Sequence, residues 1–271
     1  MKPNLNNLFS IEGKTALVTG GSRGIGEMIA AGFLSQGAKV YISSRKADVC
    51  DATAKRLSNI YAGECISLPA DLSGLDGIES LAGELTAKES KLDILINNAG
   101  AAWGAPLDEF PEIGWDKVMD TNVKSVFFLT QKLLPLLRES ASHENPARIV
   151  NIGSIDGIRT PAFDNYSYGP SKAAVHYLTR VLAAKLIKEH IIANAIAPGP
   201  FPTWMLSTAV GFGGATEGDG VDWAAVGKAN PSGRVGTMED IVGLAIFLCS
   251  RAGAYVVGET IACDGGLVVS A

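Results

Sequence analysis

Short runs of apolar residues alternate with longer amphipathic stretches along the whole chain. The apolar runs have the length and composition of buried strands, and they lie at residues 14–19, 38–43, 64–68, 92–97, 147–152, 191–196 and 259–262. Between them, a helical pattern covers residues 24–36, 47–59, 75–88, 114–139, 170–189 and 239–250. This alternation predicts a parallel sheet with helices on both faces. We therefore expect an α/β fold, a single-domain, Rossmann-like, doubly wound sheet that holds ligands at the carboxyl ends of its strands.

One segment interrupts the alternation. Residues 198–235 are rich in proline and glycine, and apolar side chains are interspersed among them, namely Trp204, Met205, Leu206 and Phe212. A long irregular loop inside a compact domain is usually functional. With no repeat and no linker to divide the chain, residues 1–271 are expected to form one domain with a mobile substrate lid at about residues 200–235.

Composition excludes several classes of protein. Of the 271 residues, 47% are hydrophobic and 19% charged, which is enough to build a large core. The net charge of −5 and the absence of a basic run argue against nucleic-acid binding. No apolar run approaches the ~18 residues of a membrane span, and the polar N-terminal stretch is unlike a signal peptide. The four cysteines are scattered, which favours reduced thiols in the cytoplasm and predicts no metal site.

A glycine-rich turn follows the first predicted strand. Residues 19–26 have the sequence TGGSRGIG, and a helix is predicted to begin there. Glycines let the backbone approach a phosphate closely, and the helix N-terminus offers it free N–H groups. In this position the turn predicts dinucleotide binding, although its spacing differs from G-x-G-x-x-G.

The end of the second strand indicates which dinucleotide is bound. A carboxylate there would select NAD by binding the ribose 2′-hydroxyl, but the sequence has Ser44 and Arg45. Arg45 can pair with a 2′-phosphate, and Arg23 in the turn adds a second positive charge. Both arginines could instead be ordinary solvated residues. We expect NADP(H) as the cofactor.

Tyr168 and Lys172 are spaced to share one face of a predicted helix. A free tyrosine has a pKa near ~10. An adjacent cation favours the phenolate, so we expect Lys172 to lower the pKa of Tyr168 towards the range useful for proton transfer. Ser154 could be taken for a hydrolase nucleophile, but its surroundings are not G-x-S-x-G and no histidine is evident as its base, so we reject that interpretation.

Together these motifs resemble the short-chain dehydrogenase/reductase family over nearly the whole chain. The matching segments are TGGSRGIG at 19–26, NNAG at 97–100, PGPFPT at 198–203 and DGG at 264–266, together with a tetrad of Asn122, Ser154, Tyr168 and Lys172. The resemblance implies catalytic roles for the tetrad. Ser154 would hydrogen-bond the substrate carbonyl and Tyr168 would transfer the proton. Lys172 would bind the nicotinamide ribose and stabilise the tyrosine anion, and Asn122 would hold a water.

The same resemblance implies the cofactor-binding residues. They come from the glycine turn, the strand ends that follow it and the start of the predicted lid, and they are Gly20, Ser22, Arg23, Gly24, Ile25, Gly26, Ser44, Arg45, Asp71, Leu72, Asn98, Ala99, Gly100, Tyr168, Lys172, Pro198, Gly199 and Thr203.

Within the family, the stretches at 144–154 and 198–202 look similar to NADPH-dependent 3-oxoacyl reductases of the rhamnolipid-associated type. The expected activity is reduction of a ketone to a secondary alcohol, with a 3-oxoacyl thioester as substrate. The segment at 215–222 is acidic, unlike the basic patch expected to meet an acidic carrier protein, so a CoA thioester or free ketone stays open. The alternatives are an NAD(P)-linked secondary-alcohol or polyol dehydrogenase and, more remotely, a non-catalytic dinucleotide-binding regulator.

Other residues are given structural interpretations. Trp103, Phe110 and Trp115 are candidates for either pocket or core, whereas Trp204, Met205 and Phe212 are expected to line the pocket. The three histidines, among them His176, are interpreted as ordinary surface or core residues. The resemblance also implies a homotetramer, because the helices predicted at 114–139 and 170–189 have apolar positions on more than one face.

Overall fold

Seven strands form one parallel sheet in the part of the chain that the computed structural model describes, which is residues 5–61, 63–160, 163–207 and 221–270. Their order across the sheet is β3-β2-β1-β4-β5-β6-β7. The strands are Thr15–Thr19 (β1), Lys39–Ser43 (β2), Cys65–Ser67 (β3), Ile94–Asn97 (β4), Ala147–Ile152 (β5), Ile191–Pro198 (β6) and Thr260–Cys263 (β7). Each coincides with a predicted strand, and the order confirms the doubly wound, Rossmann-like α/β fold.

Alternate residues of the strands are buried on opposite faces of this sheet. In β1, Ala16 and Val18 belong to one apolar cluster, whereas Leu17 belongs to the other. In β4, Ile94 and Leu95 are divided in the same way. Successive side chains of a strand point to opposite faces, so a run that is apolar throughout requires a helical layer on each side of the sheet.

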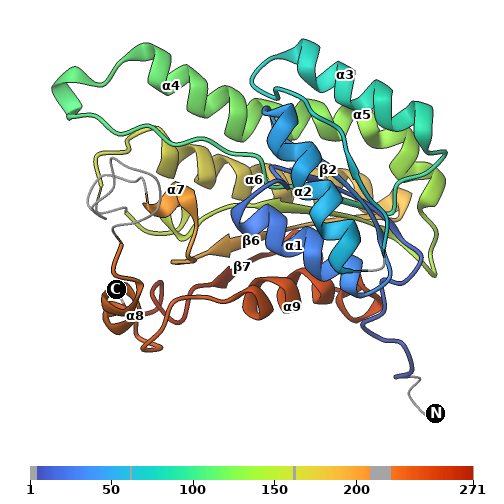
Figure 1. The fold of residues 1–271 in the computed structure, drawn as a ribbon. Coiled ribbons are helices and arrows are strands. Elements are labelled where there is room, and N and C mark those ends of the chain that lie inside the picture. Colours follow the sequence, from blue (N-terminus) through green and yellow to red (C-terminus); the bar gives the residue numbers. More distant parts are fainter. Residues whose placement is uncertain (1–4, 62, 161–162, 208–220, 271) are drawn as a thin grey trace.

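Helices supply both layers. The helices α1, α2 and α9 contribute side chains to one cluster, and α3, α5 and α6 contribute to the other. In Figure 1, α9 lies below the sheet and α3 and α5 lie above it. The helices are Gly24–Ser35 (α1), Ala47–Ile60 (α2), Leu75–Lys88 (α3), Glu112–Met119 (α4), Ser125–Ser140 (α5), Tyr168–Leu186 (α6), Trp204–Ser207 (α7), Trp223–Ala229 (α8) and Met238–Cys249 (α9).

The helix predicted at residues 114–139 differs from the observed structure. It is interrupted by a π-helical segment, Asp120–Lys124, between α4 and α5. Such segments widen one turn of a helix and are frequent at functional sites. Asn122 lies in this segment, only 1% exposed. Apolar periodicity could not show the interruption because the pattern continues on both sides of it.

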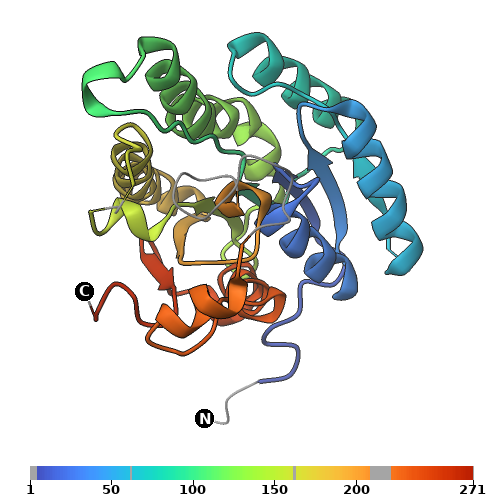
Figure 2. The ribbon, with the colours of Figure 1, turned by 60° about the vertical axis from the view of Figure 1, so that its left-hand side comes forward.

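The predicted lid contains two short helices that the sequence analysis did not identify, α7 and α8. In Figure 1 both lie on the left-hand side, with α8 below α7, and this side comes forward in Figure 2. Residues 208–220, with Phe212, lie outside the described residues, so the lid and the pocket role of Phe212 stay predictions. Among the described residues, no helix is long and apolar enough to cross a membrane.

Candidate active site

The glycine-rich turn connects β1 to α1 with its backbone closely packed. Gly20 and Gly24 have φ angles of +64° and +58°, in the left-handed region that favours glycine. A Cβ atom on Gly26 would overlap the carbonyl group of Gly20. Because only glycine permits this packing, the turn exposes its backbone beside the N-terminus of α1. That arrangement suits a diphosphate, which main-chain N–H groups and the helix dipole would stabilise.

The NNAG segment after β4 is bonded directly to this turn. The backbone N–H groups of Asn98 and Ala99 both donate to Oγ1 of Thr19, at 3.0 Å. The side-chain amide of Asn98 donates to the carbonyl oxygen of Thr19 at 2.9 Å. Two motifs that are almost 80 residues apart in sequence therefore form one structural unit.

Arg23 brings positive charge to the turn. Its guanidinium lies 4.1 Å from the centre of the Trp204 ring. Burial lowers the pKa of Arg23, and the charge of Arg45 lowers it further, which indicates that the two cations lie near each other. Thr203 also reaches the turn, because its methyl group would contact a Cβ atom on Gly24 at 3.3 Å.

The other predicted cofactor residues lie along the same edge of the sheet. After β3, the N–H of Ala70 donates to the carbonyl of Ser44 at 3.1 Å, which brings Asp71 and Leu72 near the end of β2. Asp71 accepts a hydrogen bond from the N–H of Ser73 at 3.0 Å. Leu72 is buried in the core, so its side chain contributes to packing.

The PGPFPT and DGG segments contact each other. The N–H of Gly199 donates to the carbonyl of Cys263 at 3.0 Å, and a Cβ on Gly199 would overlap Asp264. The Asp264 carboxylate accepts hydrogen bonds from the N–H groups of Gly266 and Val268, at 3.0 and 2.7 Å. Asp264 therefore has a structural role, fixing the C-terminal loop.

Ser154, Tyr168 and Lys172 come together beyond the ends of β5 and β6. Tyr168 begins α6, and the side chain of Ser154 lies close enough to its hydroxyl to lower the pKa of Tyr168. Lys172 follows one turn later, with its Nζ 5.6 Å from the centre of the Tyr168 ring. That Nζ donates to the carbonyl of Ile152, the last residue of β5, at 2.8 Å. Ser154 Oγ accepts from the N–H of Asp156 at 3.1 Å, which fixes the start of a short 3₁₀ turn, Ile155–Gly157.

The expectation that Lys172 lowers the pKa of Tyr168 is wrong for this arrangement. Burial raises the pKa of Tyr168 to about 12, while the side chain of Ser154 lowers it and the charge of Asp156 raises it. Burial also lowers the pKa of Lys172, to about 8. Both changes have one cause, because a buried site disfavours the charged form of an acid and of a base alike.

Asn122 joins α6 to the loop after β4. Its Oδ1 accepts from the N–H of Ala101 at 2.7 Å, and its Nδ2 donates to the Ala101 carbonyl and to Ser171 Oγ, both at 2.9 Å. A Cβ atom on Gly100 would contact both Asn122 Oδ1 and Lys172 Nζ. The side-chain amide of Asn122 therefore has no donor left for a water.

The aromatic candidates are dispersed. The Trp103 indole packs on Gly114, with Lys117 Nζ 5.2 Å from the centre of the ring. Phe110 makes an edge contact with Tyr166 at 5.8 Å. Trp115 and Trp204 are 43% and 47% exposed. The pocket roles of these side chains stay predictions.

Sequence reasoning missed a contact of His176. This side chain is 5% exposed, and its Nε2 accepts a hydrogen bond from the backbone N–H of Ser154 at 3.4 Å. Two features of the sequence could have suggested the contact. His176 lies four residues after Lys172, on the same face of the helix, and glycines occur at 153 and 157 on either side of Ser154.

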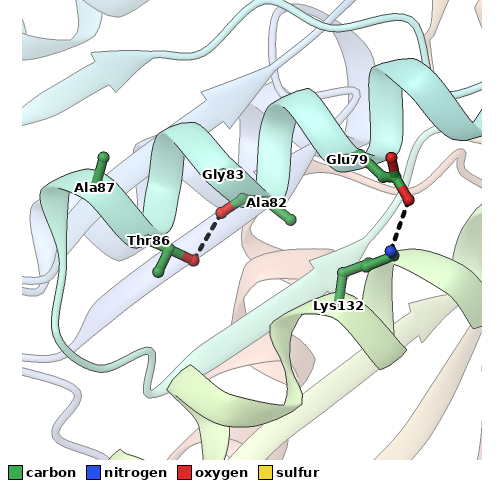
Figure 3. A pocket seen from close by; sticks show the side chains of 6 residues that line it. All are labelled: Glu79, Ala82, Gly83, Thr86, Ala87 and Lys132. Atoms are coloured by element: carbon green, nitrogen blue, oxygen red, sulfur yellow. Dashed lines mark hydrogen bonds and ion pairs between the residues drawn. The ribbon is translucent and has the colours of Figure 1, made fainter.

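A surface pocket lies elsewhere, between α3 and α5 (Figure 3). An ion pair spans it, from Lys132 Nζ to a carboxylate oxygen of Glu79 at 2.6 Å. None of its lining residues is a predicted site residue; they are Glu79, Ala82, Gly83, Thr86, Ala87 and Lys132.

Comparison with known proteins assigns the family. Residues 20–268 match a family model described as enoyl-(acyl carrier protein) reductase. The chain belongs to the short-chain dehydrogenase/reductase family and is an oxidoreductase, which confirms the resemblance in its motifs.

Individual relatives cover nearly the whole chain. It is 51% identical over 258 residues to the rhamnolipids biosynthesis 3-oxoacyl-[acyl-carrier-protein] reductase of Pseudomonas aeruginosa, covering 95% of this chain and 97% of that protein. A solved structure of the Pseudomonas aeruginosa RhlG/NADP active-site complex superposes with a TM-score of 0.88 at 50% identity, covering 99% of this chain and 100% of the other. Gluconate 5-dehydrogenase of Gluconobacter oxydans is 35% identical over 271 residues, covering 97% and 98%.

Proposed function

We propose that this chain is an NADPH-dependent reductase of ketones, with 3-oxoacyl thioesters as its substrate class. The observation that carries the proposal is that the Ser154 side chain acts directly on the Tyr168 hydroxyl, with Lys172 one helical turn away and its Nζ 5.6 Å from the centre of the Tyr168 ring. The similarity to a 3-oxoacyl-[acyl-carrier-protein] reductase over 95% of the chain supports the substrate class. The RhlG/NADP complex supports the cofactor.

The residues of the turn fit a dinucleotide. Gly20, Gly24 and Gly26 leave room for a diphosphate against the backbone, since side chains at these positions would be strained or would overlap the turn. Arg23 and Arg45 would bind a 2′-phosphate through charge-assisted hydrogen bonds. When bound, the nicotinamide supplies the hydride that reduces the carbonyl carbon.

The catalytic residues handle the proton. Ser154 would donate a hydrogen bond to the substrate carbonyl oxygen, and the Tyr168 hydroxyl would deliver a proton to it as the alcohol forms. With its pKa raised to about 12, Tyr168 is protonated near neutral pH, as a proton donor must be. Lys172 would bind the nicotinamide ribose and stabilise the phenolate left behind. Asn122, with its side chain engaged by protein groups, would hold a water only through its main-chain carbonyl or a remaining lone pair of Oδ1.

Two properties of the whole protein belong to the same proposal. Exposed apolar side chains on α5 and α6, such as Phe127, Tyr177 and Val181, support a homotetramer, which light scattering would measure. All four cysteines lie in the described part of the chain and form no disulfide, which supports a reducing, cytoplasmic location. The segment around residues 200–235 would act as the lid over the substrate.

The test is an NADPH-consumption assay with acetoacetyl thioesters of CoA and of acyl carrier protein, cyclic ketones and α-diketones. We expect thioester reduction, and Tyr168→Phe should keep NADPH affinity while its turnover falls by about 10³-fold. Tyr166→Phe is the matched control, because the Tyr166 hydroxyl donates only to Asp164 at 2.9 Å among the contacts described, and its rate should not change. Near-normal turnover in Tyr168→Phe would refute the mechanism. NADH-linked oxidation of polyols would favour a dehydrogenase, and tight NADPH binding without any turnover would favour a regulator.

A further inference from the structure

His176 lies against the loop that carries Ser154. It is on α6, one turn beyond Lys172, and its ring is almost completely buried. Gly153, Ser154 and Gly157 face the ring, and they belong to the segment that leaves β5 and forms the short 3₁₀ turn after Ser154. Tyr168, Lys172 and His176 are thus successive side chains on one face of the same helix, each spaced by four residues.

The ring is hydrogen-bonded to two points of that loop. Nε2 accepts from the N–H of Ser154 at 3.4 Å, and the backbone of Gly157 is a further hydrogen-bond partner of the imidazole. Because Nε2 is an acceptor, the ring is neutral and carries its proton on Nδ1. Burial, followed by the charges of Lys172 and Arg180, lowers the pKa of His176 to about 4, which is consistent with the neutral form.

The loop is shaped to receive the ring. A Cβ atom on Gly153 would overlap Nε2 of His176, and one on Gly157 would lie 2.8 Å from its Cε1. Glycine at both positions therefore lets the imidazole approach the backbone on each side of Ser154. The N–H of Gly157 also donates to the carbonyl of Ser154 at 3.0 Å, which closes the loop on itself.

We infer that His176 is a positioning residue that fixes Ser154 in front of Tyr168. The inference rests on the proposed function, in which Ser154 and Tyr168 act on one carbonyl oxygen. The imidazole holds the main chain of Ser154 from one side, and the N–H of Asp156 holds its Oγ from the other at 3.1 Å. Because its main chain and its Oγ are both hydrogen-bonded, the side chain of Ser154 keeps one orientation. Small displacements of a group that acts on the substrate lower turnover strongly.

The alternative is that His176 only stabilises the core, and a matched pair of variants separates the two roles. In His176→Gln, an amide oxygen can still accept from the N–H of Ser154. His176→Met has a similar length and shape but no comparable acceptor. We expect kcat to fall about 10- to 100-fold in the methionine variant and to stay within about threefold in the glutamine variant. The KM for NADPH should be the same in both.

Thr179→Val is the control for a purely structural loss. Thr179 lies one turn farther along α6, and its Oγ1 accepts a buried hydrogen bond from Asn151 on β5 at 2.9 Å. Thr179→Val removes a hydrogen bond between α6 and β5 and leaves the contacts of the Ser154 loop in place. We expect it to lower the melting temperature and to leave kcat unchanged. If Thr179→Val lowers kcat as much as His176→Met does, the positioning role is refuted.

A double-mutant cycle with Ser154→Ala completes the test. If His176 acts through Ser154, His176→Met should reduce kcat by less than about twofold once the Ser154 hydroxyl is absent. Multiplicative losses in the double variant would overturn the inference and leave the proposed function intact. A Ser154→Ala variant with full activity would refute the proposed function itself.

Discussion

The guanidinium of Arg23 is stacked on the indole of Trp204, 4.1 Å from the centre of the ring. The contact joins the glycine-rich turn to α7, the first helix after β6. An arginine that stacks by its face keeps the N–H groups at its edge free for a phosphate. In the proposed function, this contact would hold the Arg23 guanidinium in position for a phosphate group before the cofactor binds.

Trp204→Leu should raise the Kd for NADPH about two- to fivefold, the change expected when a cation–π contact at an exposed site is lost. NADH lacks the 2′-phosphate, so its affinity should not change. Trp115→Leu is a matched control, because that indole is similarly exposed but lies on α4. Dissociation constants for both cofactors, measured by fluorescence quenching, test the prediction. Equal losses for NADPH and NADH would contradict it.

Arg45→Ala should change the affinity for NADPH relative to NADH more strongly than Trp204→Leu does. We expect the Kd for NADPH to rise about 10- to 100-fold, since a charge-assisted hydrogen bond to the 2′-phosphate is lost. The Kd for NADH should change less than about twofold. Lys46→Ala, at the next position, controls for the general loss of positive charge. If Arg45→Ala binds NADPH as tightly as Lys46→Ala does, the 2′-phosphate has a partner other than Arg45.

The strands and their order follow from the sequence because each run is apolar throughout and its length fits a buried strand. The glycine turn was also predictable, since its positive φ angles and close packing demand glycine. Periodicity does not locate the π-helical turn at Asn122, because the helix predicted at 114–139 has apolar positions on more than one face, and these hide the change of phase. The role of His176 depends on how closely α6 approaches the loop of Ser154, which is a property of tertiary packing. The direction of the Tyr168 pKa shift also depends on burial, which outweighs the lowering effect of Ser154.

Asn151→Leu should destabilise the protein without touching the proposed site. Asn151 is fully buried, accepts from Asn97 Nδ2 at 2.8 Å and donates to Thr179 Oγ1 at 2.9 Å. Leucine leaves both partners short of a bond, at a cost of about 2–4 kcal/mol. Asn59→Leu on the exposed face of α2 should change the stability by less than about 0.5 kcal/mol. Urea denaturation compares them, and equal midpoints would show that the buried network contributes nothing.

Lys172→Met should make the protein more stable at neutral pH while abolishing turnover. Burial lowers the pKa of Lys172 from 10.5 to about 8, so the charged form is disfavoured in the folded state. Below pH 8 the lysine is charged in both states and the full cost, about 3 kcal/mol, is present. Between pH 8 and 10.5 the unfolded chain binds more protons, so the stability of the wild type rises with pH in that window.

The melting temperature of Lys172→Met should therefore exceed that of the wild type by several degrees at pH 7, and the difference should shrink towards pH 10. Above pH 10, Tyr168 acts in the opposite direction, because its raised pKa makes the folded state retain a proton that the unfolded chain loses. The comparison is therefore made between pH 7 and pH 10. Lys185→Met, on the exposed face of the same helix, should show no such trend. A constant difference between Lys172→Met and wild type across this range would mean that the lysine is not held with a lowered pKa.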